Sequence, residues 1–277
     1  MPIGPRTQLC AVLLHPAGHT RSPAMHNAAF AALDLDAVYL AFDVPPAALG
    51  AAIVGARGLA IRQLAISIPH KESVLAHLDE LDDTARQIGA VNTVTRRADR
   101  LVGSNTDWIG AVQAIERETP LSGRDVVILG AGGTARAVAW GARERGARVA
   151  VLNRTPGRAE QLVRQLGIGH AGTLDELPAM PCDILVNTTS VGLRSDASPI
   201  RADAIPPGSV VLDAVYEPAR TRLLRDAEAR GARTVEGKWM LVYQAAEQLR
   251  LWSECEPPIG VMADAFDAAA DAFDADA

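Results

Sequence analysis

The chain has 277 residues, of which 48% are hydrophobic, and a formal net charge of -6 at pH 7. This length allows one large domain or two medium ones, each with its own hydrophobic core. No apolar stretch approaches the roughly 20 residues that a membrane-spanning helix needs, and the mild acidity argues against a nucleic-acid surface, which needs clustered Lys and Arg.

The first hundred residues alternate short apolar runs with Ala-rich segments whose apolar residues recur at helical spacing. This alternation predicts strands separated by helices, in a βαβ pattern. The predicted strands are residues 9–14, 37–42, 64–68 and 91–95. The first of these runs is too short and too weakly flanked by positive charge for a signal peptide, so we expect no export.

A connecting helix is predicted at 107–118, where apolar residues recur at helical spacing up to Thr119 and Pro120. A second α/β unit follows it, with a helix at 134–145. Its predicted strands are residues 125–129, 149–153, 184–187 and 210–215. Past residue 236 the spacing is helical again, and the acidic, low-complexity end of the chain suits a helix end or a solvated tail.

A glycine-rich motif follows the strand predicted at 125–129. GAGGTA at 130–135 lies between that strand and a helix, and a second strand ends at Asn153. This order directs free backbone amides and the positive end of the helix at a pyrophosphate. We therefore predict dinucleotide binding here, with an ordinary glycine turn as the alternative. The residues concerned are Gly130, Ala131, Gly132, Gly133, Thr134 and Ala135.

The end of that second strand indicates which dinucleotide is bound. NAD enzymes normally carry Asp or Glu there, whereas this chain has Asn153, Arg154 and Thr155, with Arg158 one turn on. Two guanidinium groups can clamp a ribose phosphate with charge-assisted hydrogen bonds, while Asn and Thr can bond the ribose. NADP is therefore favoured over NAD, with a pair of solvated arginines as the alternative.

Together these patterns predict two α/β units, the second of them of Rossmann type, and helices past residue 236 that can pack back on the first unit.

Polar motifs also end the strands of the first domain. IPHKE at 68–72, GAVNT at 89–93 and SNTD at 104–107 lie at or near strand ends, where ligands collect in open α/β sheets. Lys71 and Lys238 are the only lysines among 27 basic residues, and only Lys can lose its proton or offer a compact ammonium to a reacting oxygen. The Lys, the two Asn and the Asp of the three motifs would suit an oxygen-rich substrate better than an apolar one. The alternative for the two lysines is a random place on the surface, and the alternative for Lys71 with Asp107 is a plain salt bridge.

With these motifs in view, the chain resembles the shikimate dehydrogenase family. Seven motifs follow the family's order and spacing over nearly the whole chain. They are HTRSP at 19–23, IPHK at 68–71, GAVNT at 89–93, NTD at 105–107, GAGGTAR at 130–136, NRT at 153–155 with Arg158, and GKWMLVYQA at 237–245. The resemblance implies a cytoplasmic enzyme of the chorismate pathway of aromatic amino acid biosynthesis, which reduces 3-dehydroshikimate reversibly to shikimate with NADPH. It also implies an α/β fold of two domains with a cleft between them. Residues 1–107, completed by C-terminal helices at 238–277, would form a substrate-binding and catalytic domain with a mixed sheet, and residues 108–237 a Rossmann-type NADP-binding domain.

The resemblance also implies roles for single residues. Lys71 and Asp107 look like the family's catalytic pair, which exchanges a proton with the substrate oxygen while hydride moves to or from the nicotinamide. Thr20 and Ser22 would hold the substrate carboxylate, and both could also cap the helix that follows them. Further substrate contacts are implied for Ser67, Asn92, Tyr216 and Gln244, and further cofactor contacts for Ala214 and Gly237.

Three departures from the family's pattern leave the substrate open. Ala65 stands where the family commonly has a polar residue, Ser67 where Thr is usual, and Trp108 where a small Gly is typical. One missing hydrogen bond is typically worth about 1 kcal/mol. The alternatives are a paralogue that acts on quinate, an aminoshikimate or another cyclic hydroxy acid, and, from another class, a non-catalytic NADP-binding regulatory protein.

The remaining histidines and cysteines predict no metal site. Cys10, Cys182 and Cys255 include no CxxC pair, which argues against zinc and disulfides and favours a reducing compartment. His15 and His19 flank Pro16 and Gly18, which breaks any helical metal spacing. We expect a small-molecule substrate, no nucleic-acid or membrane partner, and a monomer or homodimer.

Overall fold

The computed structural model describes residues 3–18 and 20–275, with the side chains of its last helix as far as residue 269. The chain divides into two compact units. Unit 1 comprises residues 1–106 and 244–277, and unit 2 comprises residues 107–243. Among the described residues, no helix is both long enough and apolar enough to cross a membrane.

Unit 1 is built on a mixed sheet. Its elements are β1 (Gln8–Leu14), α1 (Ser22–Ala32), β2 (Ala37–Asp43), η1 (Pro46–Ala48), α2 (Leu49–Gly58), β3 (Gln63–Ile66), η2 (Ser73–His77), β4 (Glu80–Leu81), α3 (Asp83–Ile88), β5 (Thr93–Arg97), β6 (Arg100–Ser104), the second part of α8 (Gly237–Ser253) and α9 (Ile259–Ala275). The strands lie in the order β2-β1-β3-β5-β6-β4. The pairs β1–β2, β1–β3 and β4–β6 are parallel, whereas β5 is antiparallel to both of its neighbours.

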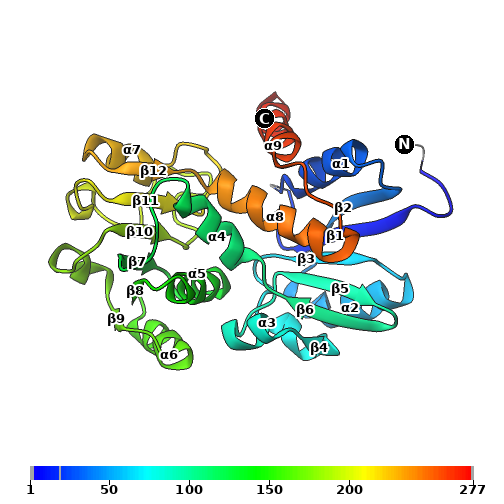
Figure 1. The fold of residues 1–277 in the computed structure, drawn as a ribbon, viewed down its shortest axis with the longest axis horizontal. Coiled ribbons are helices and arrows are strands. Elements are labelled where there is room, and N and C mark those ends of the chain that lie inside the picture. The colour runs from blue at the N-terminus through cyan, green and yellow to red at the C-terminus, as the bar shows by residue number, and fades with distance from the viewer. Residues whose placement is uncertain (1–2, 19, 276–277) are drawn as a thin grey trace. The chain divides into compact units, whose positions relative to one another are not determined.

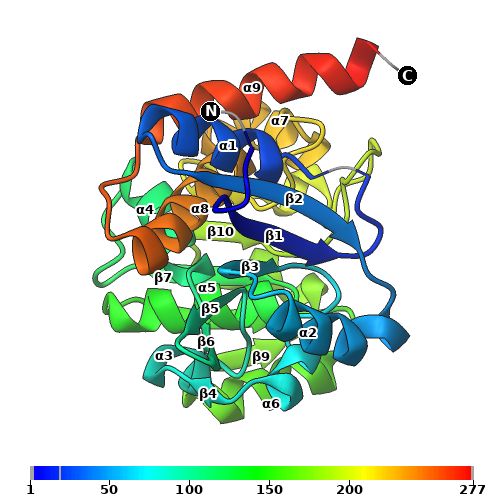
Figure 2. The same cartoon turned by 90° about the vertical axis from the view of Figure 1, so that its right-hand side faces the viewer.

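Alternate residues of these strands fill the two faces of the sheet, as the two-residue period of a strand requires. On one face, Leu13 and Leu64 pack with Ile53 of α2 in a buried apolar cluster. On the other, the ring of His26 in α1 stacks on that of Tyr39 in β2, with centroids 4.1 Å apart. Helices α1 and α9 run side by side over this second face (Figure 2).

Unit 2 is built on a parallel sheet. Its elements are α4 (Asp107–Glu116), β7 (Asp125–Leu129), α5 (Gly133–Glu144), β8 (Arg148–Leu152), α6 (Pro156–Leu166), β9 (His170–Gly172), η3 (Leu174–Ala179), β10 (Ile184–Asn187), η4 (Ala202–Ala204), β11 (Val210–Asp213), α7 (Arg222–Ala229), β12 (Arg233–Val235) and the first part of α8. The strands lie in the order β12-β11-β10-β7-β8-β9 and all of their pairings are parallel (Figure 1).

This strand order is that of a Rossmann sheet. The chain builds outward from β7 through β8 to β9, then crosses back to place β10, β11 and β12 on the other side of β7. In such sheets a dinucleotide binds at the carboxyl ends of the strands, where the order reverses. The predicted α/β fold class, with one mixed sheet and one Rossmann-type sheet, is confirmed.

Candidate active site

Two glycines in the turn from β7 to α5 serve different purposes. Gly130 has a φ of +110°, and a Cβ built on it would lie 2.7 Å from the hydroxyl oxygen of Thr188, so both conformation and space exclude a side chain. Gly132 is the N-cap residue of α5, and a Cβ there would meet nothing within 4 Å. A ligand can therefore approach the N-terminal amides of α5 over Gly132. The other motif residues of this turn are Ala131, Gly133, Thr134 and the fully buried Ala135.

The end of β8 carries the two arginines that indicate NADP. Arg154 and Arg158 are exposed, and neither guanidinium has an ion-pair partner within the part of the chain that the structure describes. By contrast, Arg164 of the same helix lies 3.9 Å from a glutamate one turn away. Asn153 donates from Nδ2 to the carbonyl oxygen of Thr155 at 2.9 Å, and Thr155 is the N-cap residue of α6. Two uncompensated positive charges thus lie at the positive end of a helix dipole.

The ends of β10 and β11 meet at a buried carboxylate that the sequence analysis did not identify. Asp213 is fully buried and accepts hydrogen bonds from Asn187 Nδ2 at 2.8 Å, from the Val215 amide at 3.0 Å and from the Thr221 hydroxyl at 2.6 Å. Burial outweighs these hydrogen bonds and raises the pKa of Asp213 to about 6. The sequence does carry a signal for Asp213 and Asn187, because each is a polar residue that ends an otherwise apolar strand.

Ala214 and Gly237 come together beside this carboxylate. A Cβ on Gly237 would lie 2.6 Å from the carbonyl oxygen of Asp213 and 2.9 Å from that of Ala214, so α8 begins in direct contact with the turn after β11. Tyr216 follows in the same turn and is half-buried. These predicted residues therefore lie at the carboxyl edge of the parallel sheet, where ligands bind in this type of fold.

Unit 1 contains a buried amide network centred on Asn92. Its Nδ2 donates to Gln244 Oε1 at 3.1 Å and to Thr106 Oγ1 at 2.9 Å, while its Oδ1 accepts from the Thr106 amide at 2.7 Å. One turn beyond Gln244, Gln248 donates from Nε2 to the Asn92 carbonyl at 3.2 Å. The structure thus brings together Asn92 and Gln244, two predicted substrate residues. It adds Thr106 and Gln248, to which the sequence analysis gave no role.

Ser67 and Lys71 lie on the segment next to this network. The Lys71 carbonyl accepts a hydrogen bond from the amide of Val91, one residue before the network, at 2.8 Å. The His70 amide donates to the Ser67 carbonyl at 2.8 Å, and the fully buried His70 ring places Nε2 2.7 Å from the carbonyl oxygen of Val44. The backbone on both sides of Lys71 is therefore fixed, and its side chain is half-buried.

Asp107 is the first residue of α4 and of unit 2, and it is 4% exposed. It directly follows Thr106 in the chain, whose amide and hydroxyl belong to the Asn92 network. Lys71 belongs to unit 1. Each member of the predicted catalytic pair is thus attached to its own fixed backbone.

Thr20 and Ser22 lie together at the start of α1. The Thr20 hydroxyl donates to Ser22 Oγ at 3.2 Å and accepts from the Ser22 amide at 3.3 Å. The N-cap residue of α1 is Arg21, whose side chain makes no capping hydrogen bond, and Ser22 is the first helical residue. Two hydroxyl groups therefore share one small region of unit 1, as the predicted carboxylate site requires.

Within the described residues, no group of three or more His, Cys, Asp or Glu side chains could hold a metal ion. His19, which the sequence analysis considered as a ligand, lies outside these residues. The three cysteines are free thiols, and burial raises the pKa of Cys10 and of Cys182 to about 12. These two thiols are therefore not reactive thiolates at neutral pH.

Comparison with known proteins agrees with these features. Residues 12–94 match the family model of the shikimate dehydrogenase substrate binding domain, residues 112–193 that of shikimate / quinate 5-dehydrogenase, and residues 237–265 that of the shikimate 5'-dehydrogenase C-terminal domain. The chain is 47% identical over 258 residues to the shikimate dehydrogenase (NADP(+)) of Thermococcus kodakarensis, which covers 92% of this chain and 94% of that protein. The chain belongs to the shikimate dehydrogenase family.

Solved structures of the family have the same fold. Shikimate 5-dehydrogenase from Thermus thermophilus, in complex with NADP(H) and shikimate, aligns with a TM-score of 0.89 and 41% identity, covering 95% of this chain and 99% of that one. Quinate dehydrogenase from Corynebacterium glutamicum, in complex with NAD, aligns with a TM-score of 0.85 and 30% identity, with the same coverage of both chains. The fold is therefore shared by dehydrogenases of different substrates.

Two departures from the family's pattern lie in packed surroundings. Ala65 is 7% exposed and pairs with Thr93 across the antiparallel strands β3 and β5. Trp108 packs edge-on against Trp140 of α5, with ring centroids 4.9 Å apart. A Cβ built on Gly141 of α5 would lie 3.1 Å from the Cβ of Trp108. The indole of Trp108 thus packs α4 against α5 within unit 2.

Proposed function

We propose that this member of the shikimate dehydrogenase family catalyses the reversible, NADPH-dependent reduction of 3-dehydroshikimate to shikimate. The observation that carries the proposal is the 47% identity to a shikimate dehydrogenase (NADP(+)) over 92% of this chain and 94% of that protein. In the reductive direction the carbonyl carbon gains a hydride and the carbonyl oxygen gains a proton, which gives the alcohol.

The residues of unit 2 fit NADP(H). The open side of Gly132 would admit the pyrophosphate to the start of α5, and Arg154 and Arg158 would clamp the ribose phosphate. Ala214 and Gly237 would border the nicotinamide half, beside the end of β11. When bound, the cofactor supplies the hydride for reduction and takes it back in oxidation.

The polar residues of unit 1 suit a carboxylate that carries several ring hydroxyls. Thr20 and Ser22 would hold the carboxylate through their two hydroxyl groups, which lie 3.2 Å apart. Asn92 and Gln244 would bond ring oxygens, with Ser67 of unit 1 and Tyr216 of unit 2 as further contacts. The hydrogen bond between Asn92 and Gln244 orients both amides before the substrate arrives. Because both Nδ2 protons of Asn92 are already bonded within the protein, a ring oxygen would replace one of these two bonds.

Lys71 and Asp107 would carry the proton. In reduction the Lys71 ammonium would donate its proton to the carbonyl oxygen as hydride reaches the neighbouring carbon, and the Asp107 carboxylate would orient the substrate and the amine. In oxidation the neutral amine would take the hydroxyl proton. The fixed backbone around Lys71 supports this role, because proton transfer needs a donor held within hydrogen-bond reach of the reacting oxygen.

One specific observation favours a second candidate. Ala65 cannot make the ring hydrogen bond for which the family commonly has a polar side chain, and a quinate dehydrogenase shares this fold at 30% identity. Quinate or another cyclic hydroxy acid is therefore the alternative substrate. We further propose that the protein works in a reducing, cytoplasmic compartment, which its three free thiols support, and that it is a monomer or homodimer.

Initial rates of the purified chain test the proposal. Shikimate and quinate would each be offered with NADP+ and with NAD+, and the appearance of the reduced cofactor followed by absorbance. We expect the highest kcat/KM for shikimate with NADP+. Turnover of quinate without turnover of shikimate would transfer the assignment to the second candidate, and NADP+ binding without turnover of either acid would indicate a regulatory protein.

A further inference from the structure

Unit 2 holds a buried acid that the proposed reaction does not use. Asp213 is fully buried, and within the described part of the chain it has three hydrogen-bond donors and no cationic partner. It ends β11 and is aligned in register with Asn187, which ends β10. A carboxylate buried without a counter-ion is unfavourable for folding, so its hydrogen bonds must hold it in place.

The three hydrogen bonds tie Asp213 to three separate segments. The Val215 amide belongs to the turn after β11, and the Thr221 hydroxyl belongs to the N-cap residue of α7. Asn187 extends the connection to the loop after β10, because its Oδ1 accepts from the Thr189 amide at 3.0 Å and from the Thr189 hydroxyl at 2.8 Å. One carboxylate therefore fixes the loop after β10, the turn after β11 and the start of α7.

These segments lie at the carboxyl edge of the sheet. The register aligns Leu152 of β8, Leu129 of β7, Asn187 of β10 and Asp213 of β11 in one row across four strands. The residues that follow Leu152, Leu129 and Asp213 in the chain are proposed cofactor contacts. They are Asn153, Gly130 and Ala214. Asp213 and Asn187 thus lie one residue below the proposed cofactor surface.

The strand order indicates which half of the cofactor they serve. A Rossmann sheet binds one mononucleotide on each side of the reversal point, and β7 and β8 carry the glycine turn and the arginines for the adenosine half. The nicotinamide half would therefore bind beside the ends of β10 and β11. We propose that Asp213, acting through Asn187, Val215 and Thr221, is a positioning residue that holds the nicotinamide-side loops of unit 2.

This inference rests on the proposed function for the identity of the cofactor. Its test uses the variant Asp213→Ala, which removes both acceptor oxygens and so all three hydrogen bonds, and calorimetric binding of two probes in the absence of substrate. Adenosine 2′,5′-bisphosphate contains the adenosine half of NADP and no nicotinamide. We expect the Kd of NADP+ to rise about tenfold or more, equivalent to the loss of one or two hydrogen bonds, while the Kd of the bisphosphate stays within about twofold.

A role in general stability predicts a different result. If Asp213→Ala raises the Kd of both probes by the same factor, or changes neither Kd, the positioning role is overturned. Asp213→Asn is the conservative variant, because its amide oxygen can accept the same two bonds as Oδ1 and its NH2 group can face the Thr221 hydroxyl. We expect it to keep the Kd of NADP+ within about threefold of the original chain. A loss as large as that of Asp213→Ala would contradict positioning by hydrogen bonds.

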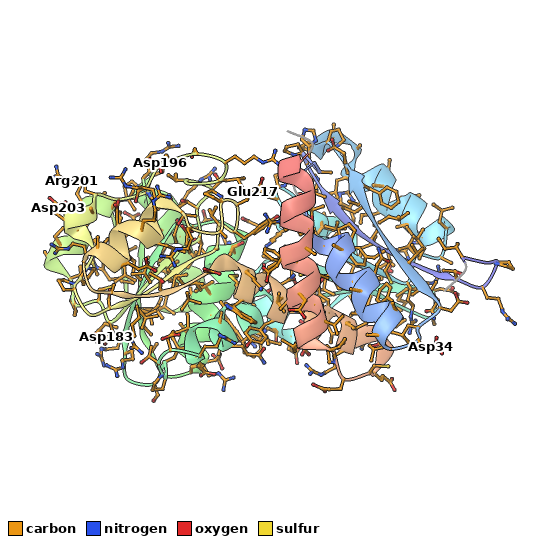
Figure 3. The ribbon with its side chains drawn as sticks, turned by 90° about the horizontal axis from the view of Figure 1, so that it is seen from above. Asp34, Asp183, Asp196, Arg201, Asp203 and Glu217 are labelled. Carbon is orange, nitrogen blue, oxygen red and sulfur yellow. The ribbon has the colours of Figure 1, made fainter. Side chains whose placement is uncertain are left out.

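A second pair of variants covers the case in which Asp213→Ala does not fold. Thr221→Val removes one of the three donors and keeps the side-chain shape, whereas Thr221→Ser keeps the donor. We expect only Thr221→Val to raise the Kd of NADP+ relative to the Kd of the bisphosphate. An equal ratio of the two dissociation constants in both variants would overturn the inference. Asp203→Ala is the matched control, because Asp203 is exposed and pairs at 2.6 Å with Arg201, beside it in Figure 3.

The outcome is separable from that of the proposed function. Turnover of shikimate by the original chain tests the reaction, whereas the ratio of the two dissociation constants tests Asp213 and needs no turnover. A chain that fails to oxidise shikimate and still shows the selective loss of NADP+ binding in Asp213→Ala would reject the reaction and keep the positioning role.

Discussion

At the scale of single residues, Arg154 and Arg158 differ from most other arginines of the chain in having no carboxylate partner among the described residues. A hydrogen bond to a charged group is typically worth about 1.5–3 kcal/mol. Loss of the two arginines' hydrogen bonds to the ribose phosphate should therefore lower the affinity for NADP+ by about ten- to a hundredfold. We expect the double variant Arg154→Gln, Arg158→Gln to raise the KM for NADP+ by that factor and to change the KM for NAD+ little.

Arg164→Gln is the control for this change, because it removes a positive charge from the same helix at a residue that is already paired with Glu160. We expect its KM for NADP+ to match that of the original chain. Equal increases in the KM for NADP+ and for NAD+ in the double variant would show that the two arginines do not recognise the phosphate.

The buried carboxylate of Asp213 gives a prediction for stability against pH. Its pKa of about 6 in the folded chain lies above the ordinary value of 3.8, so the folded state holds its proton more tightly than the unfolded state. The resulting stabilisation is complete below about pH 4 and is lost as the pH rises through 6, which amounts to about 3 kcal/mol.

Asp213→Asn cannot titrate at this site. We therefore expect the free energy of unfolding of the original chain, relative to that of Asp213→Asn, to fall between about pH 4 and pH 7. Urea unfolding of both chains across this range measures the difference. Parallel curves for the two chains would mean that the carboxyl group is not buried as the structure has it.

At the scale of elements, the start of α8 is pressed against the end of β11. A Cβ on Gly237 would lie less than 3 Å from three backbone carbonyl oxygens, which cannot move aside as a side chain could: those of Asp213, Ala214 and Val215. We expect Gly237→Ala to lower the free energy of unfolding by about 1–3 kcal/mol, the usual effect of overpacking, and to weaken NADP+ binding.

Gly260 in α9 provides the matched control, because a Cβ there would meet nothing within 4 Å. Gly260→Ala should leave NADP+ binding unchanged and raise the free energy of unfolding by up to about 1 kcal/mol through better helix propensity. Thermal or urea unfolding measures both variants. A Gly237→Ala chain as stable as Gly260→Ala would contradict the close approach of α8 to β11.

Sequence periodicity located most of the longer strands and missed β6 and the shortest ones. The strands expected at 125–129 and 184–187 coincide with β7 and β10, because each is a continuous apolar run buried on both faces. The shortest strands, β4, β9 and β12, have two or three residues each, which is too few to show any alternation. The strand expected at 91–95 begins later, at Thr93, although the backbone of Asn92 still bonds to Ile66 and Ser104 in the strands on either side.

At the scale of the whole molecule, local motifs of the sequence predict candidate site residues, whereas the hydrogen bonds that hold these residues come from the structure. Motifs such as GAGGTA and NRT can be recognised locally, because the contacts predicted for each lie within a few residues of chain. The hydrogen bonds of Asn92 with Gln244 and of Asp213 with Asn187 join residues 152 and 26 positions apart. Such pairs depend on how the strands are assembled, which no local spacing records, and this is why the hydrogen bonds of Gln248 and Asp213 emerged only from the structure. Of these two residues, Asp213 has a signal in the sequence, as a polar residue that ends an apolar strand.

The proposed reaction depends on the Lys71 side chain, which would exchange the proton with the substrate oxygen. The chain offers an unusually clean comparison for it, because its one other lysine is Lys238. The decisive measurement is kcat for shikimate oxidation with NADP+ in Lys71→Ala and Lys238→Ala, with NADP+ binding measured separately. We predict that Lys71→Ala lowers kcat by about 10²–10⁴-fold at unchanged NADP+ affinity, while Lys238→Ala turns over like the original chain. Unchanged turnover in Lys71→Ala would contradict the assignment of Lys71 as the residue that exchanges the proton.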